Sequence, residues 1–204
     1  MLRREAGETI TERPARDVVL LAGDAEMSIT WSRYGAGERG PDLHVHREHV
    51  DAFYVLEGEL TFHLGPAGDP VRVGPGGFVA VPPDVAHGFA NESGAEASWL
   101  NFHAPDAGFA QYLRDARDGN DAAFDSFDPP PDGGPAPDGV VVVPAGDGER
   151  LVVDGVGVLL KGELPGLAVA ECDRALPSPR PGDRRWALGG GRVLTVSAVS
   201  PDAV

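Results

Sequence analysis

The sequence predicts an all-β fold, and three observations support this prediction. Short apolar runs of strand length recur along the chain, and several alternate apolar with polar residues. Gly, Pro and Asp separate these runs, as in the turn-forming stretch GPAGDP at 65–70. Only the segment 106–119 has the spacing of an amphipathic helix. Many short strands at such intervals are typical of a β-sandwich or a closed barrel.

The first seven runs precede the helical segment. They occupy residues 18–23, 27–35, 44–46, 52–58, 59–65, 78–82 and 98–105. The helix is predicted because apolar residues stand at i, i+3, i+4 and i+7 from Phe109. Asp106 is suited to cap its start, and Gly119 is suited to end it.

A boundary is predicted where the chain contains only Asp, Pro, Gly and Ala, because this composition cannot form a packed core. Beyond it, the runs VVVVP, RLVVDG, GVLLKG, LAVAEC and RVLTVSAV are again strand-like, and no histidine occurs among them. We therefore expect an N-terminal arm at 1–17, a barrel at 18–104, a helical segment at 105–127, a linker at 128–138 and a small C-terminal β unit at 139–204.

Charge and cysteine content exclude several classes of protein. The net charge of -15 and the sequence pI of about 4.6 argue against a nucleic-acid or anionic-membrane partner, because both require a basic face. Cys172 is the only cysteine, so an intrachain disulfide and a thiolate metal cluster are both excluded. We expect a cytoplasmic protein, because no apolar run long enough for a membrane span or a signal sequence occurs.

The histidines are concentrated in one part of the sequence. All six lie between residues 44 and 103, at 44, 46, 49, 63, 87 and 103. On an extended segment, His44 and His46 project from the same face and can bind one ion. Neutral imidazole suits Zn, Fe, Ni, Cu or Mn.

Two longer runs extend this pattern, GERGPDLHVHREHVDAFYVLEG from Gly37 and GGFVAVPPDVAHGFAN from Gly76. They resemble the two motifs of the cupin superfamily. The first cupin motif is G, five residues, HxH, three or four residues, Glu, six residues, Gly; it falls on His44, His46, Asp51 in place of Glu, and Gly58. The second is G, five residues, PxG, two residues, His, three residues, Asn; it falls on Gly76, Pro82, Asp84 in place of Gly, His87 and Asn91.

The resemblance implies a cupin jelly-roll barrel with one divalent transition metal, Fe(II) ahead of Mn, Ni, Zn or Cu. His44, His46 and His87 are the implied ligands, and the fourth is Asp51 or His49. Asp is one methylene shorter than the family's Glu, and His49 points to the same side of an extended strand as Asp51. Of the remaining histidines, His63 is expected to face solvent. His103 either lines the barrel mouth or stands at the exit of its strand before Pro105, and the second position is favoured.

The stretch FYVLEGELTF is similar to the quercetinase-like type, which implies a small-molecule dioxygenase. Two alternatives stay open. One is a metal-dependent isomerase, epimerase or cyclase in which a neighbouring histidine carries a proton, and the other is a non-catalytic metal- or ligand-binding cupin. The expected partner is a small-molecule substrate, without nucleic acid or membrane, and a homodimer is expected as one way to cover a sheet edge.

A weak internal repeat is the last feature of the sequence. VLLAG at 19–23 matches VLLKG at 158–162, although short Val/Leu strands before Gly also resemble one another by chance. If one constant shift relates the two halves, Arg184 and Trp186 stand at the positions of His44 and His46. The C-terminal unit would then be a degenerate cupin half without a metal site.

Overall fold

The computed structural model describes residues 1–132, 134–137 and 139–199. This part of the chain is built of β-strands, with one α-helix and a short 3-10 turn at Arg4–Ala6. The all-β prediction is therefore confirmed. Within the described residues, no helix is both long and apolar enough to cross a membrane.

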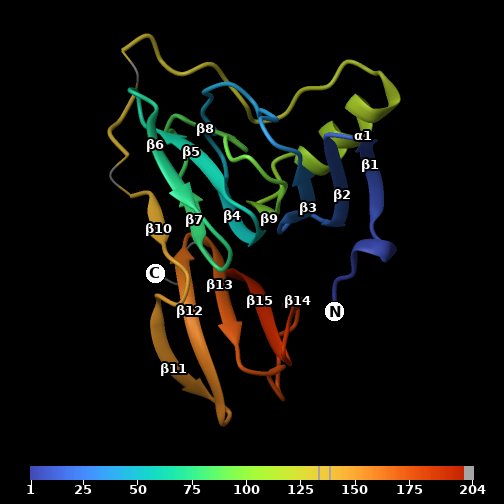
Figure 1. The fold of residues 1–204 in the computed structure, drawn as a ribbon, viewed down its shortest axis with the longest axis vertical. Coiled ribbons are helices and arrows are strands. Elements are labelled where there is room, and N and C mark those ends of the chain that lie inside the picture. Colours follow the sequence, from blue (N-terminus) through green and yellow to red (C-terminus); the bar gives the residue numbers. More distant parts are fainter. Residues whose placement is uncertain (133, 138, 200–204) are drawn as a thin grey trace.

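The strands form three antiparallel sheets (Figure 1). A seven-stranded sheet has the order β1-β2-β3-β9-β4-β7-β10, a three-stranded sheet the order β6-β5-β8, and a C-terminal sheet the order β11-β12-β13-β15-β14. The bounds are β1 Glu8–Arg13, β2 Arg16–Gly23, β3 Ser28–Tyr34, β4 Val50–Glu57, β5 Leu60–Leu64, β6 Asp69–Val73, β7 Phe78–Val81, β8 His87–Ala90, β9 Ala97–Ala104, β10 Val141–Val143, β11 Glu149–Val153, β12 Val156–Leu164, β13 Gly166–Cys172, β14 Arg184–Gly189 and β15 Arg192–Val199.

The seven-stranded sheet is covered on both faces, which explains why its central strands are buried along almost their whole length. Phe53 and Val55 of β4 pack toward the three-stranded sheet, and the two sheets together form an open jelly-roll barrel. The alternate residues Ala52 and Tyr54 pack in a second core with residues of the C-terminal sheet, such as Leu167. Both cores therefore depend on the same strands.

Three local features differ from the sequence predictions. The HVH run forms no named strand: His44 and Val45 make only isolated bridges, to His87 and Phe127. Strand β1 lies inside the segment expected as an N-terminal arm, where no strand was predicted. The helix, α1 (Phe109–Asp118), begins three residues after Asp106 but ends at Gly119 as predicted.

The C-terminal sheet repeats the strand order β1-β2-β3-β9-β4 of the large sheet. The correspondence includes two irregularities. In the pairing of β2 with β3, Leu21 has no partner, and in the pairing of β12 with β13, Lys161 has none. In the matched VLLAG and VLLKG runs, Lys161 stands one position later than Leu21. Similarly, β4 and β14 each carry a register shift just before their last pairing with the neighbouring strand. This agreement favours a repeat over chance resemblance, while the assignment of the C-terminal unit as a degenerate cupin half stays a proposal.

A constant shift between the two halves is wrong for β14. Val196 of β15 corresponds to Phe102 of β9, because they pair with the equivalent residues Val169 and Ile29. Arg184 pairs with Val196 and Ala52 pairs with Phe102, so Arg184 corresponds to Ala52 and not to a histidine. Arg184 and Trp186 therefore do not correspond to the HxH pair. A shorter connection before β14 changes the offset, and the described residues contain no counterpart of the HxH segment in the C-terminal sheet.

Candidate metal centre

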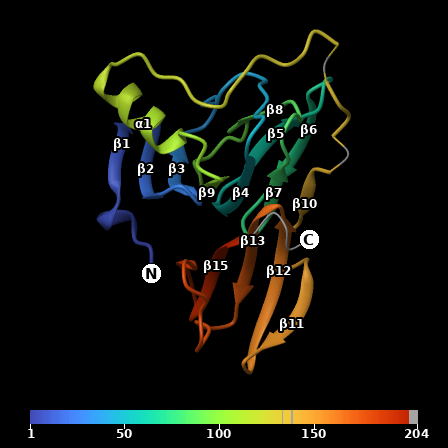
Figure 2. The same ribbon diagram turned by 180° about the vertical axis from the view of Figure 1, so that it is seen from behind.

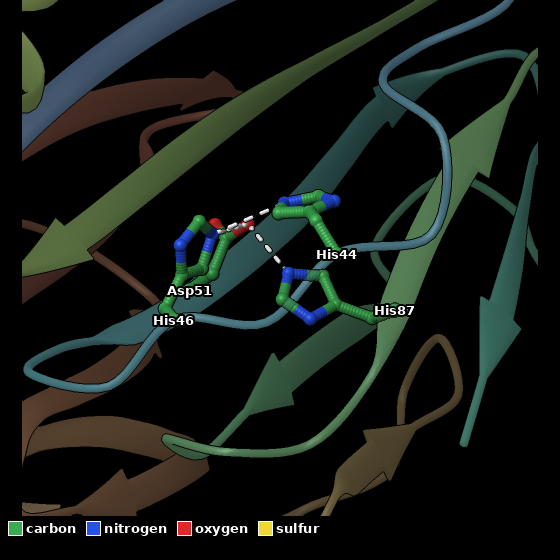
Figure 3. Close-up of side chains that lie close together, drawn as sticks. All are labelled: His44, His46, Asp51 and His87. Atoms are coloured by element: carbon green, nitrogen blue, oxygen red, sulfur yellow. Dashed lines mark hydrogen bonds and ion pairs between the residues drawn. The ribbon is translucent and has the colours of Figure 1, made fainter. Parts of the chain in front are cut away.

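Three histidines present the same ring nitrogen to one point inside the barrel (Figure 3). His44 and His46 lie on the connection between β3 and β4, and His87 begins β8. The backbone amides of His44 and His87 each donate to the other's carbonyl at 2.9 Å, which joins the two segments. Each Nδ1 is hydrogen-bonded to a backbone carbonyl: His44 to Asp42 (2.8 Å), His87 to Val85 (2.9 Å) and His46 to Asp125. Because Nδ1 donates, each Nε2 keeps a free lone pair.

Asp51 of β4 lies with these histidines. Its Oδ2 is 3.2 Å from His87 Nε2 and 3.7 Å from His46 Nε2, and the ligand atoms of all four residues lie within 4.8 Å of one another. Asn101 Nδ2 donates to Asp51 Oδ1 at 2.5 Å, which leaves Oδ2 for the centre. Ligand atoms that share one transition metal at about 2.1 Å lie roughly 3 to 4 Å apart, so three imidazoles and one carboxylate fit such an ion.

The electrostatics prepare the same residues for a cation. Burial lowers the pKa of His44 to about 4, and the neighbouring His87 and His46 contribute to this shift. Burial opposes ionisation of Asp51, but contacts with His103, His46 and His87 outweigh it and hold the pKa of Asp51 well below its ordinary value. At neutral pH the centre therefore holds a neutral His44 and an ionised Asp51, the protonation states that metal binding requires.

His49 lies outside the group formed by His44, His46, Asp51 and His87. Its Nδ1 is 2.9 Å from Asp125 Oδ2, and its Nε2 is 2.8 Å from His103 Nδ1. Both ring nitrogens of His49 are thus engaged. Asp125 also accepts hydrogen bonds from two backbone amides of the 47–48 turn, at 2.7 to 3.0 Å, which fixes its carboxylate. Of the two residues left open for the fourth position, Asp51 is the one that meets the three histidines.

The favoured position of His103, at the exit of its strand, is wrong, because its side chain is only 3 % exposed. The alternative position, at the mouth of the barrel, is the one that the structure shows. Its Nε2 lies 3.1 Å from Asn101 Oδ1 and 3.6 Å from Asp51 Oδ1, and its ring stacks on Phe109 at 3.7 Å. The helical segment after β9 folds back over this end of the barrel, a tertiary contact that strand parity does not reveal.

Two other polar residues near the motif, His63 and Glu48, lie outside the centre. His63 is partly exposed, with 32 % of its side chain accessible, and its Nε2 lies 3.0 Å from Glu92. Glu48 is exposed. We assign neither residue to the centre.

A cavity of about 500 Å³ opens onto the centre. His44, His46 and Asp51 line one end, and the aromatic side chains of Phe109, Tyr112 and Phe124 form a wall. Figure 2 shows the chain after α1 crossing this end of the molecule on its way to β10. The helical spacing predicts only that Phe109 and Tyr112 share an apolar face, and no sequence pattern marks Phe124 or Asp125.

Comparisons with known proteins agree with this description. The family model described as a cupin domain matches residues 30–103, which include all six histidines. No curated protein matches the chain. Among solved structures, the Escherichia coli protein Ylba has 13 % identity and a TM-score of 0.60, and the match covers 98 % of this chain and 82 % of that one.

Two further solved structures are similar to this chain. A putative glyoxylate-induced protein from Pseudomonas aeruginosa has 16 % identity and a TM-score of 0.59, over 94 % of this chain and 84 % of that one. KdgF from Halomonas sp. has 18 % identity and a TM-score of 0.45, over 52 % of this chain and 92 % of that one. The Ylba and Pseudomonas matches include the C-terminal sheet, so the fold of nearly the whole chain is shared with solved proteins.

Proposed function

Residues 30–103 make this chain a member of the cupin superfamily, and on that premise we propose that it is a divalent-metal-dependent enzyme acting on a small organic molecule. The observation that supports this proposal is the common anchoring of three histidines. Each Nδ1 is held by a backbone carbonyl, so each Nε2 is left free in the group that also contains the carboxylate of Asp51. His44, His46, His87 and Asp51 would hold the ion.

The first candidate reaction is the dioxygenation expected from the quercetinase-like resemblance. A bound transition metal supplies Lewis acidity and, in the case of iron, redox chemistry toward O2. The protein would position the substrate between the centre and the aromatic wall of Phe109 and Tyr112, which also excludes water. Oxygen uptake by the iron-loaded protein with catechols and 1,3-dicarbonyl compounds tests this reaction, and uptake no faster than that of free iron contradicts it.

The second candidate is a metal-assisted isomerisation, epimerisation or cyclisation, which a specific observation favours. Asp125, His49, His103 and Asn101 form a buried chain joined by three polar contacts of 2.8 to 3.1 Å, called here the histidine chain. His49 Nδ1–H donates to Asp125, and His103 Nδ1–H donates to His49 Nε2. Asn101 donates to Asp51 through Nδ2, so the Oδ1 atom of Asn101 faces His103 Nε2. When both imidazoles are neutral, His103 Nε2 carries no proton and cannot donate to this oxygen.

The histidine chain is therefore complete only after it gains one proton. Burial lowers the pKa of His49 to about 4 and holds that of His103 well below its ordinary value, so both imidazoles are neutral at pH 7. His103 lines the cavity and can take a proton from a substrate at Nε2, whereas His49 and Asp125 position it. Solvent-deuterium exchange into a substrate, without oxygen uptake, would support this reaction.

The ligand set is tested by metal analysis of the purified protein. We expect one transition ion per chain, loss of stoichiometric binding in His87→Ala and Asp51→Ala, and retained stoichiometry in His49→Ala. His63→Ala is the matched control, because it removes a histidine outside the centre. Loss of metal in His49→Ala with retention in Asp51→Ala would assign the fourth position to His49 instead.

Metal binding also separates the enzyme proposals from a non-catalytic cupin that binds only a ligand. A protein that binds no transition metal, and gains no thermal stability when Fe, Mn, Ni, Zn or Cu is added, would contradict both enzyme proposals. The cytoplasmic location and the homodimer remain predictions. Fractionation of the native cells and the solution mass of the purified protein test them.

A further inference from the structure

The metal cavity has a charge balance opposite to that of the chain. Three arginines line it, Arg13, Arg16 and Arg117, together with a single carboxylate, that of Asp51. The whole chain carries 17 basic and 32 acidic residues. A cavity enriched in cations within an acidic protein is suited to an anionic ligand, because the local field draws the ligand in while the rest of the surface repels it.

Two of these arginines lie side by side at the end of the β1–β2 hairpin. Arg13 and Arg16 are directly opposite each other in the strand register. Side chains at opposite positions project from the same face of a sheet, where like charges destabilise the pair. The fold therefore places two arginine side chains on one face of the hairpin, and both line the cavity.

The two guanidinium groups differ in their partners. Arg16 pairs with Glu38, with Nε 2.8 Å from Oε1, and its guanidinium lies over the ring of Tyr34 at 4.4 Å. Arg13 is exposed, and it makes no ion pair with any residue in the described ranges. Arg117 is neutralised by Glu8 and Asp118. Arg13 is thus the uncompensated cation of the cavity.

We propose that the ligand of this cavity is a small carboxylate, whose carboxylate group pairs with Arg13 while donor oxygen atoms at its other end approach the metal centre. This inference rests on the proposed metal function. A guanidinium offers parallel N–H donors that match a carboxylate. Apolar and aromatic side chains that line the same cavity, among them Tyr34 and Trp99, accommodate the apolar body of the ligand.

The test compares two catechols that differ in one carboxylate, 4-methylcatechol and 3,4-dihydroxyphenylacetate. Both present the same pair of oxygens to a metal. Binding is measured by calorimetry on the zinc-loaded protein, because zinc does not oxidise catechols. We expect the acid to bind on the order of 10-fold more tightly than the neutral catechol, as one charge-assisted contact provides.

Variants identify the residue responsible. Arg13→Gln removes the preference for the acid and leaves affinity for 4-methylcatechol within about twofold, because only the carboxylate loses its partner. The control is Arg72→Gln on β6, which removes the same charge from a side chain that is 71 % exposed and lies outside the cavity. Equal affinity of the wild-type protein for the two catechols, or an unchanged preference in Arg13→Gln, would overturn the inference.

Metal analysis on the same samples separates this inference from the proposed function. Protein that takes up no zinc contradicts the metal function, and the two catechols are then compared on the metal-free protein. A preference for the acid that depends on Arg13 still supports the carboxylate site. Zinc uptake together with equal binding of the two catechols contradicts the carboxylate inference alone.

Discussion

At the scale of single residues, Asp125 determines the direction of every hydrogen bond in the histidine chain. As an ionised carboxylate it only accepts, so His49 must carry its proton on Nδ1. Its hydrogen bonds with the Glu48 and Arg47 amides and with His49 outweigh the effect of burial and hold the pKa of Asp125 below its ordinary value. The remaining bonds of the chain follow from this one polarity.

The variant Asp125→Asn is predicted to keep that polarity but to remove the charge that supports it. Oδ2 of Asp125 accepts from both the Glu48 amide and His49 Nδ1, so the amide oxygen of Asn takes this position. The neutral amide no longer stabilises the imidazolium that forms when His103 takes a proton. We expect unchanged metal stoichiometry and a fall in kcat of about 10-fold or more, because the weakened base accepts the proton less readily.

The pH profile distinguishes this role from a structural one. Weakening of a proton acceptor shifts the limb of the kcat profile that reports it, whereas a local distortion lowers kcat evenly at all pH values. An even loss, or wild-type turnover on a substrate whose conversion requires proton transfer, would contradict the assigned role. Asp128→Asn serves as the control, because it makes the same change at an exposed carboxylate of the same segment, outside the cavity.

Sequence patterns identified part of the centre at this scale. His44, His46 and His87 could be placed because their spacing within two motifs carries the information. His103 and Asp125 could not, because Asp125 lies 76 positions from His49 along the chain and no periodicity links them. Strand parity predicts that Asn101 and His103 share one face of the strand. It does not predict whether that face is covered. The helical segment decides that question.

At the scale of elements, an ion pair joins β2, β3 and the 3-10 turn that precedes β1. Asp17 of β2 accepts a hydrogen bond from Arg33 Nε of β3 at 2.9 Å, and Arg4 lies 3.4 Å from the same oxygen. The hydrogen bond from Arg33 is the main cause that holds the pKa of Asp17 below its ordinary value of 3.8. The side chain is 11 % exposed, so screening by solvent is limited.

The pH dependence of this pair has a defined sign. Because the pKa of Asp17 is lower in the folded protein, its contribution to stability is present above pH 3.8 and is lost as the pH falls through the folded value. We expect Asp17→Asn to lower the free energy of unfolding by about 1 to 3 kcal/mol at pH 7 and by less at pH 3. Urea denaturation at both pH values measures this difference.

The exposed pair of Arg117 with Asp118 provides the control. Asp118→Asn should change the free energy of unfolding little, because solvent screens a surface pair. A loss in Asp17→Asn that is equally large at pH 3 would show that the ion pair is not its cause. Strand β1, which contributes to this edge of the sheet, escaped prediction because ETITER is polar and only one of its residues is buried.

At the scale of the whole molecule, the two halves share one apolar core. Strand β4 packs its alternate residues into both cores, and Leu167 and Val169 of β13 contact the same cluster as Ala52 and Tyr54. A boundary at 128–138 was predicted because that segment cannot pack. The structure places β10, which follows it, in the large sheet beside β7, so a break in composition does not mark a break in the core.

We therefore predict that both halves unfold in one transition. Leu167 is fully buried, and Leu167→Ala should cost about 2 to 5 kcal/mol through lost contacts and a residual cavity. Hydrogen exchange at increasing urea, followed by mass spectrometry, reports β4 and β13 separately. In one cooperative unit the substitution lowers the midpoints of both strands together, whereas independent halves would lose protection in β13 alone. Leu151→Ala, on the edge strand β11 and 39 % exposed, should shift both midpoints little.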